Sequence, residues 1–200
     1  MNYNFYSKIL IISAHPDDLE ISCAGTVKKF IKAGTVVDNL IMIPNVPHLK
    51  YLDSSAFGLG FNYIVFDNDI DRPNIVDNKL IQEVEEKYSL FGYDLIISHW
   101  KEDWHQDHRM CYHLTNSLRR KQPIDVWYMD AFPYNQKYNQ FRNNVFVGID
   151  NEIEDKIKAV KEYKNLSEDT IDSIIKYNRY RGDFINCDFA ETFMVDTIVI

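Results

Sequence analysis

The sequence predicts an α/β protein in which a mainly parallel, twisted sheet carries helices on both faces, within a single domain of residues 1–200. Short apolar runs of strand length alternate with longer segments of helical periodicity, and this alternation is typical of a parallel sheet. The length suits one domain. The content of 46% hydrophobic and 26% charged residues is that of a globular chain, which excludes wholesale disorder.

Local patterns define each element. The run KILIISA is continuous and rich in isoleucine, as expected of a buried strand. After it, Leu19, Cys23 and Val27 recur at helical spacing, and Gly34 is suited to the helix end. Ser167 is suited to the start of the last helix. The segment before the third strand is expected to hold a helical turn. The predicted strands are residues 8–14, 36–43, 63–66, 94–98, 126–129, 146–149 and 193–200, and the predicted helices are 18–33, 74–90, 107–121, 152–166 and 167–181.

The strand order decides where a ligand would bind. In a doubly wound sheet of order 3-2-1-4-5, the first and fourth strands are neighbours, and ligands bind beyond their carboxyl ends. The loops that follow these two strands, at residues 14–20 and 98–109, are therefore the predicted site. Four of the six histidines of the chain lie in these two loops.

Charge and composition exclude several classes of function. The formal net charge of −8 argues against a nucleic-acid binder, because phosphate binding needs a basic surface. The longest apolar runs are too short to span a bilayer, and we expect no membrane insertion. No secretory signal is readable at the start, and three widely spaced cysteines without a CxxC pair suggest reduced thiols in a cytoplasmic protein. The expected partner is a small molecule, and a homo-oligomer is possible.

The two loops contain side chains suited to a metal site. His15 and Asp18 are three residues apart at a strand-to-helix turn, so both can face one point. His108 of the second loop can complete a set of two histidines and one carboxylate. That set suits a catalytic zinc ion with an open position, and it also suits ferrous iron. Asp17, whose side chain diverges from that of Asp18, could take the proton of a water on the metal.

A second histidine of the same loop extends the site. His105 lies three residues before His108 and could approach from the other side, with Asp107 to orient it. Simpler explanations exist, since Asp17 or Asp18 alone could cap the first helix, and a lone HxxH pair is often surface decoration. The occurrence of both motifs after predicted neighbouring strands favours the metal site.

Other residues are candidates for supporting roles. His99, at the end of the fourth strand, is expected to support the site rather than to act as a fourth ligand. His48 is expected in a loop at the site entrance. Glu191 is a candidate for support from the C-terminal segment, with packing as the alternative. The aromatic residues that could form a sugar-stacking wall, with core packing as the alternative, are Trp100, Trp104, Phe132, Tyr134 and Tyr138.

The segment AHPDDLE at residues 14–20, followed by HQDHR at 105–109, resembles the signature pair of the PIG-L/LmbE-like deacetylases. Weaker similarity at 180–182 and 190–193 extends the resemblance over most of the chain. It implies a Rossmann-like fold and zinc-dependent hydrolysis of N-acetyl groups on amino sugars. The resemblance also implies roles for six residues: metal ligation by His15, Asp18 and His108, general base catalysis by Asp17, stabilisation of the oxyanion or protonation of the leaving amine by His105, and a carboxylate partner for His105 in Asp107.

The expected function is therefore the removal of an N-acetyl group from an amino sugar or its conjugate, with zinc or another divalent transition metal such as Fe²⁺. The alternatives are hydrolysis of a different amide, iron-dependent oxygenation, or a sugar- or nucleotide-binding module without turnover. Ser22 and Ala24 stand where the family usually has glycines, and no arginine occurs between Met1 and Arg72. These departures do not affect the expected chemistry, but they leave the particular substrate undefined.

Overall fold

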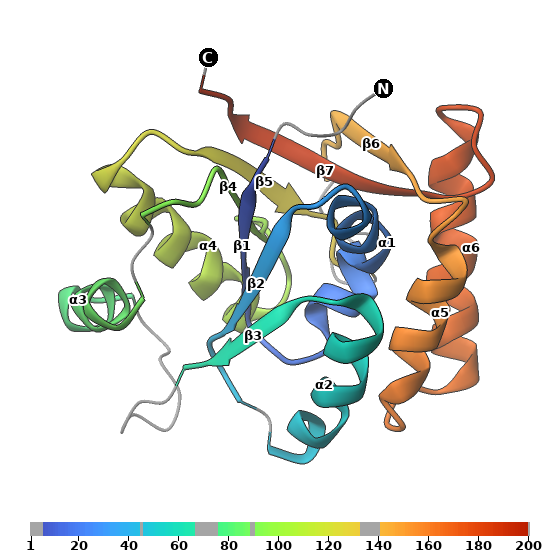
Figure 1. The fold of residues 1–200 in the computed structure, drawn as a ribbon, viewed down its shortest axis with the longest axis horizontal. Coiled ribbons are helices and arrows are strands. Elements are labelled where there is room, and N and C mark those ends of the chain that lie inside the picture. The colour runs from blue at the N-terminus through green and yellow to red at the C-terminus, as the bar shows by residue number, and fades with distance from the viewer. Residues whose placement is uncertain (1–5, 45, 67–75, 89–90, 133–140, 200) are drawn as a thin grey trace.

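The strands of the protein form one sheet of order β3-β2-β1-β4-β5-β7-β6 (Figure 1). The computed structural model describes residues 6–44, 46–66, 76–88, 91–132 and 141–199. The first five strands are parallel and lie in the predicted order, with β1 between β2 and β4. The strands are β1 (Lys8–Ser13), β2 (Val36–Ile41), β3 (Asn62–Val65), β4 (Leu95–His99), β5 (Asp125–Met129), β6 (Val145–Gly148) and β7 (Ala190–Thr197).

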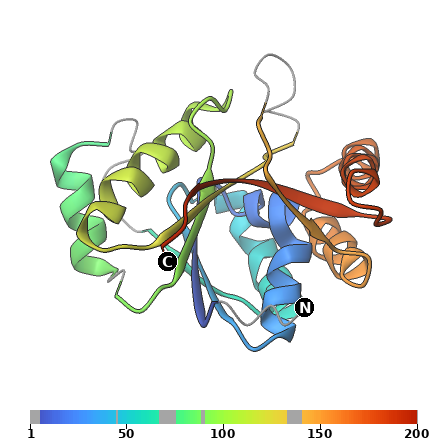
Figure 2. The same cartoon turned by 90° about the horizontal axis from the view of Figure 1, so that it is seen from above.

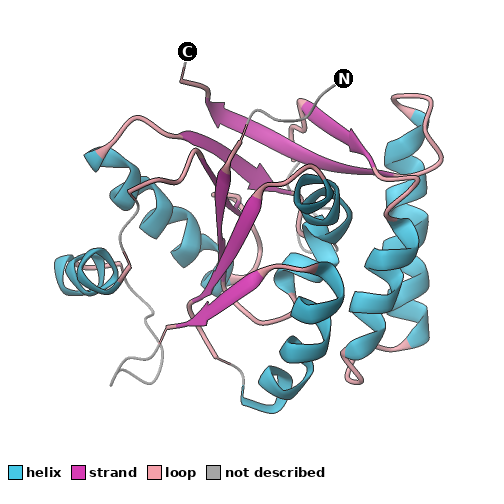
Figure 3. Cartoon of the chain, in the orientation of Figure 1, coloured by secondary structure: helices cyan, strands magenta, loops and turns pink. Residues whose placement is uncertain are grey.

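Helices cover both faces of this sheet, as the sequence predicts (Figure 3). One face carries α3 and α4, and the other carries α1, α2 and α5, with α6 beside α5 (Figure 2). The alternation of β1 explains the two layers, because Ile9 and Ile11 pack in one core and Leu10 and Ile12 in the other. The helices are α1 (Asp18–Lys32), α2 (Val46–Leu59), α3 (Asn78–Lys87), α4 (Gln106–Leu118), α5 (Ile153–Glu162) and α6 (Glu168–Asp183), with a 3₁₀ turn at Arg119–Lys121.

The C-terminal end of the sheet is mixed rather than parallel. Strand β7 is antiparallel to both of its neighbours, β5 and β6. Two helices, α5 and α6, connect β6 to β7 and lie side by side in Figure 1. A pair of antiparallel helices returns the chain to the end where β6 stopped, so the next strand must run the opposite way. A single crossover helix would have kept the strand parallel.

Helix α2 is longer than the helical turn that the sequence predicts for this segment. Leu52, Ala56 and Leu59 recur at helical spacing, and all three are buried against the sheet. Pro47 lies in the first turn, where a helix tolerates proline. The structure thus replaces the expected loop around His48 with the start of a helix.

The other elements deviate from their predicted bounds by a few residues. Helix α3 begins at Asn78 rather than at residue 74, because the Asp77 side chain caps it by accepting the Leu80 amide (2.8 Å). Residues 74–75 and 89–90 of that prediction lie outside the described residues. Gly34 follows α1 with a φ of 97°, and Ser167 caps α6, both as predicted. None of the helices in the described ranges is both long enough and apolar enough to traverse a bilayer.

Candidate metal centre

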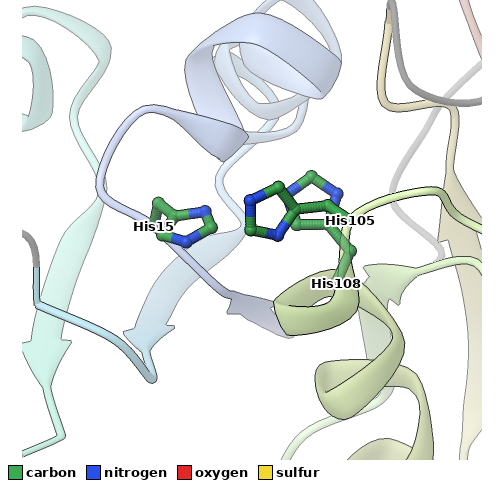
Figure 4. Close-up of side chains that lie close together, drawn as sticks. All are labelled: His15, His105 and His108. Carbon is green, nitrogen blue, oxygen red and sulfur yellow. The ribbon is translucent and has the colours of Figure 1, made fainter. Parts of the chain in front are cut away.

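The two predicted loops meet at the carboxyl edge of the sheet. Strands β1 and β4 pair in parallel, so the turn after β1 and the loop after β4 leave the sheet side by side. The first supplies His15, Asp17 and Asp18, and the second supplies His105 and His108 at the start of α4. In Figure 4, His15 faces the rings of His105 and His108 across the site.

Three side chains form a candidate set of metal ligands. Asp18 Oδ1 lies 3.2 Å from His108 Nε2, and Asp18 Oδ2 lies 3.6 Å from His15 Nδ1. Nitrogen atoms of His15, His105 and His108 lie within 4.8 Å of one another. Four ligands at about 2.0–2.1 Å from a tetrahedral zinc ion are separated from each other by about 3.3 Å. Asp18 thus contacts both predicted histidines, through a different oxygen for each, and the donor chemistry of His15, Asp18 and His108 suits a divalent transition metal.

Carboxylates orient both of these histidines. Asp103 Oδ2 lies 2.9 Å from His108 Nδ1, and both side chains are buried. Asp107 Oδ2 lies 3.1 Å from His15 Nε2. A carboxylate that accepts a hydrogen bond from one ring nitrogen leaves the lone pair of the other nitrogen for a metal. Asp103 was not among the predicted site residues, although it lies five positions before the candidate ligand His108.

The environment of Asp107 differs from the prediction. Its carboxylate was expected to orient His105, but Oδ2 lies closer to His15 Nε2, at 3.1 Å, than to His105 Nδ1, at 3.8 Å. His105 is instead fixed by the backbone at the N-cap of α4, where its Nδ1 accepts the Asp107 amide (3.3 Å). This contact puts the proton of the neutral ring on Nε2.

His99, which was expected to support the site, lies against Asp18 and His108. It is fully buried, its ring stacks on that of His108 at 3.9 Å, and its Nε2 lies 3.1 Å from Asp18 Oδ2. The Ala14 amide also donates to this nitrogen (3.2 Å). Two groups of donors among the described residues are close enough to hold a metal ion: one is His15, His105 and His108, and the other is Asp18, His99 and His108. The contact with Ala14 occupies Nε2 and favours His15 as the ligand.

The pKa values of the two adjacent aspartates, Asp17 and Asp18, are shifted in opposite directions. The pKa of Asp18 lies well below its usual value, although burial alone would raise it, because His108 and His99 stabilise its charge. Burial and the nearby charge of Asp18 raise the pKa of Asp17. Burial would lower the pKa of His108, but Asp18 and Asp103 outweigh it and raise the value to about 10. The cluster therefore attracts positive charge, and Asp17 is the better proton acceptor of the pair.

Asp17 faces the site rather than capping a helix. It occupies the N-cap position of α1, yet among the described residues its side chain makes no capping hydrogen bond. Its Oδ2 lies 3.9 Å from His48 Nδ1 of α2. The capping explanation, left open by the sequence, is therefore not supported for Asp17.

A cavity of about 310 Å³ opens beside these residues. One side of it is polar and contains the candidate ligands, and the other side is apolar. Of the predicted aromatic wall, Phe132 lines the cavity, Trp104 is exposed next to His105, and Trp100 packs against Phe141. Tyr134 and Tyr138 lie outside the described residues. The lining consists of His15, Asp17, Asp18, Ile21, His48, His105, His108, Phe132, Asn165, Leu166, Thr170 and Ile174.

The C-terminal segment supports the turn that carries Asp17 and Asp18. Helix α1 is interrupted at Cys23, and Glu191 of β7 accepts two successive backbone amides after the break (3.0 and 2.7 Å). Lys156 of α5 donates to the Ile21 carbonyl before the break (2.9 Å) and pairs with Glu191 (2.7 Å). This buried ion pair satisfies backbone groups that the broken helix leaves open. Glu191 was a predicted candidate for such support, whereas Lys156 was missed.

Comparison with solved structures identifies the class of fold. No protein-family model matches the sequence. The 4-carboxy-2-hydroxymuconate hydratase GalB from Pseudomonas putida KT2440 is 14% identical, with a TM-score of 0.79 over 97% of this chain and 98% of that one. The N,N'-diacetylchitobiose deacetylase from Pyrococcus horikoshii is 18% identical, with a TM-score of 0.71 over 97% and 85%. A zinc-inhibited form of the teicoplanin deacetylase Orf2 is 14% identical, with a TM-score of 0.73 over 96% and 100%.

The structural neighbours of the chain thus include deacetylases of the LmbE/PIG-L type, the family that the sequence motifs resemble. At these identities the likeness establishes a shared fold. The same fold also includes a hydratase, so the reaction must be argued from the site itself.

Proposed function

We propose that the protein is a metal-dependent hydrolase that removes the acetyl group from an N-acetylated amino sugar or its conjugate, with zinc or another divalent transition metal such as Fe²⁺. The observation that carries the proposal is that Asp18 contacts both His15 and His108 at the edge of the cavity, and that Asp17 lines the same cavity. Deacetylases among the structural neighbours support the same reaction class.

When bound, the metal would polarise the amide carbonyl and lower the pKa of a bound water to about 7. His15, Asp18 and His108 hold it in this proposal. Asp17 accepts the proton of the attacking water, for which its raised pKa suits it better than an ordinary aspartate. After this transfer, Asp17 is a neutral carboxylic acid that faces the cavity.

His105 acts on the carbonyl oxygen. Burial and the charges of His108 and His15 lower the pKa of His105, so the ring is a neutral donor at pH 7. Its Nδ1 accepts from the backbone, and its Nε2–H donates to the oxygen as negative charge develops there. Protonated Asp17 or His105 supplies the proton that the departing amine takes. The products are acetate and a free amine, with one water consumed.

A screen of N-acetylhexosamine conjugates, including nucleotide- and lipid-linked ones, tests this proposal directly. Protein stripped of metal and reloaded with Zn²⁺, Fe²⁺ or Mn²⁺ is expected to release acetate in equal amount to free amine. Because one neighbour is described as zinc-inhibited, each metal is titrated from below one equivalent. Absence of acetate release with every metal and every conjugate would contradict the proposal.

A second candidate is hydration of an unsaturated acid, which the fold similarity to GalB favours. The substrate of that enzyme is named as a carboxylated compound, and anionic substrates need cationic partners. Among the described residues that line the cavity there is no lysine or arginine. This observation favours a neutral amide over a polycarboxylate. Loss of ultraviolet absorbance from 4-carboxy-2-hydroxymuconate, without amine release from any conjugate, would reverse the choice.

A further inference from the structure

One wall of the cavity is apolar and lies apart from the metal-binding side chains. It consists of Ile21, Phe132, Leu166 and Ile174, hereafter the apolar wall. These residues come from α1, the segment after β5, the α5–α6 turn and α6. The wall is therefore assembled from four parts of the chain that only the folded protein brings together.

The apolar wall is the open side of a small hydrophobic cluster. Ile174 belongs to a buried cluster with Val160 and Ile171, and Ile21, Phe132 and Leu166 pack against that cluster while remaining partly exposed. All three of these partly exposed side chains also line the cavity. Part of their surface is thus open to the cavity.

Phe132 is held in a fixed orientation. Its ring stacks on Tyr177 at 4.8 Å with an interplanar angle of 25°. The Tyr177 hydroxyl hydrogen-bonds to Asp130, which is paired with Arg181 at 2.9 Å. Phe132 therefore presents a preformed aromatic face to the cavity.

The chemistry of an acetylated sugar does not account for this wall. An acetyl group has one methyl group, which is too small to contact four side chains. Sugar hydroxyls placed against it would lose water without gaining hydrogen bonds. An alkyl or aryl group would instead remove the wall from water, which is favourable.

We propose that the apolar wall binds an apolar substituent of the substrate next to the scissile amide, so that the preferred substrates are N-acylated amino sugars bearing an alkyl or aryl group. This inference rests on the proposed function. The substituent is a longer N-acyl chain or an apolar aglycone, and both present the same chemistry to the wall. Two substrate series distinguish these sources.

The first series lengthens the acyl group of N-acylglucosamine from acetyl through butyryl to hexanoyl. The second lengthens the aglycone of N-acetylglucosaminides from methyl through butyl to hexyl. Along one series, kcat/KM is expected to rise roughly fourfold for each methylene that is buried. Values that stay flat or fall along both series would overturn the proposal.

Variants locate the effect on the wall. Leu166→Ser is expected to flatten the rise, and Thr170→Val, which extends the wall with a side chain of similar size, is expected to steepen it. The matched control is Ile175→Ser, because Ile175 packs on the same cluster without lining the cavity. An equal rise in all three variants would place the apolar contact elsewhere and overturn the proposal. Thr170→Val keeps the test decisive if Leu166→Ser does not fold.

Direct binding separates this inference from the proposed function. Calorimetry compares hexyl with methyl β-glucosaminide on the same preparations, with no turnover required. If no substrate in either series is hydrolysed, the proposed function fails. A tighter Kd for the hexyl compound that is lost in Leu166→Ser but kept in Ile175→Ser would still support the apolar wall. Equal Kd values for both compounds in the unaltered protein would overturn it.

Discussion

The two ends of the sheet contribute differently to the site. The parallel end, β3-β2-β1-β4-β5, carries all of the candidate metal ligands and the candidate base on the loops after β1 and β4. The mixed end, with β6, β7, α5 and α6, carries no candidate ligand. It instead supplies the Lys156–Glu191 pair behind α1 and much of the apolar wall. The reactive side chains and the residues that support them thus come from different parts of the chain.

Besides Lys156 and Glu191, a third residue of the mixed end contacts the turn that carries the reactive groups. Tyr163, which follows α5, donates from its hydroxyl to the Pro16 carbonyl in the turn between His15 and Asp17 (2.7 Å). Its hydroxyl also lies 3.1 Å from Glu20 Oε1. The turn that carries the reactive groups is therefore fixed by a residue 147 positions away in sequence.

Removal of a candidate ligand is expected to have the largest effect. His108→Ala and Asp18→Ala each delete a donor atom, so both should lower metal affinity by more than the roughly 100-fold typical of losing an outer hydrogen-bond partner, and should abolish acetate release. Metal content per chain after dialysis measures this. Asp172→Asn on the exposed side of α6 is the control, and full occupancy in either ligand variant would rule out the assigned set.

Loss of His105 is expected to reduce turnover rather than metal binding. His105→Ala removes one donor to the developing oxyanion, and kcat should fall on the order of a hundredfold or more. Asp107→Asn should instead weaken metal binding about 10- to 100-fold, because its carboxylate lies closer to His15 than to His105. Metal affinity and kcat are measured on one preparation of each variant. If His105→Ala instead loses its metal but regains a normal kcat when metal is added back, then His105 is the ligand and His108 has the role assigned here to His105.

A smaller effect on activity, with a large one on stability, is expected at the mixed end of the sheet. Lys156→Met or Glu191→Gln leaves a buried group without its partner and should lower the free energy of unfolding by about 3–5 kcal/mol. The double variant should recover part of the loss. Urea denaturation measures this, with the exposed Lys164→Met as control. A 100-fold loss of metal affinity in the folded single variants would show instead that the pair belongs to the site.

The last effect, which is the smallest when taken per pH unit, concerns the pH dependence of stability. Burial raises the pKa of Glu20 from its ordinary 4.5 to about 8. Between these values the folded protein holds a proton that the unfolded chain releases, so stability falls as pH rises, by at most about 1.4 kcal/mol per pH unit. Glu20→Gln should flatten this slope in metal-free protein, whereas the exposed Glu154→Gln should not. Parallel slopes for Glu20→Gln and the unaltered protein would show that Glu20 is ionised when folded.

The sequence predicts the parallel end of the sheet because its signals are local. Continuous apolar strands, helical spacing after Leu19 and two motifs at strand ends are all readable within about a dozen residues. The order of five strands and the meeting of both loops follow from general rules of α/β topology, and the structure agrees with them.

The remaining features depend on contacts that are distant in sequence. Lys156 looks like a solvated lysine in a charged helix, and only the break in α1 and the position of Glu191 make it a buried partner. The nearer partner of Asp107 is His15 rather than His105, since the choice depends on side-chain placement at the start of α4. The antiparallel direction of β7 follows from two crossover helices rather than from its own composition.

The central claim is that two adjacent aspartates have different roles: Asp18 binds the metal, and Asp17 is the base that accepts the proton of water. The most direct test measures metal content and acetate release on the same preparations of Asp17→Asn and Asp18→Asn. Asp17→Asn should keep one metal ion per chain and lose turnover by about 10²- to 10⁴-fold, because an amide cannot accept the proton of water. Asp18→Asn should lose metal. Near-normal acetate release by metal-loaded Asp17→Asn would contradict the account.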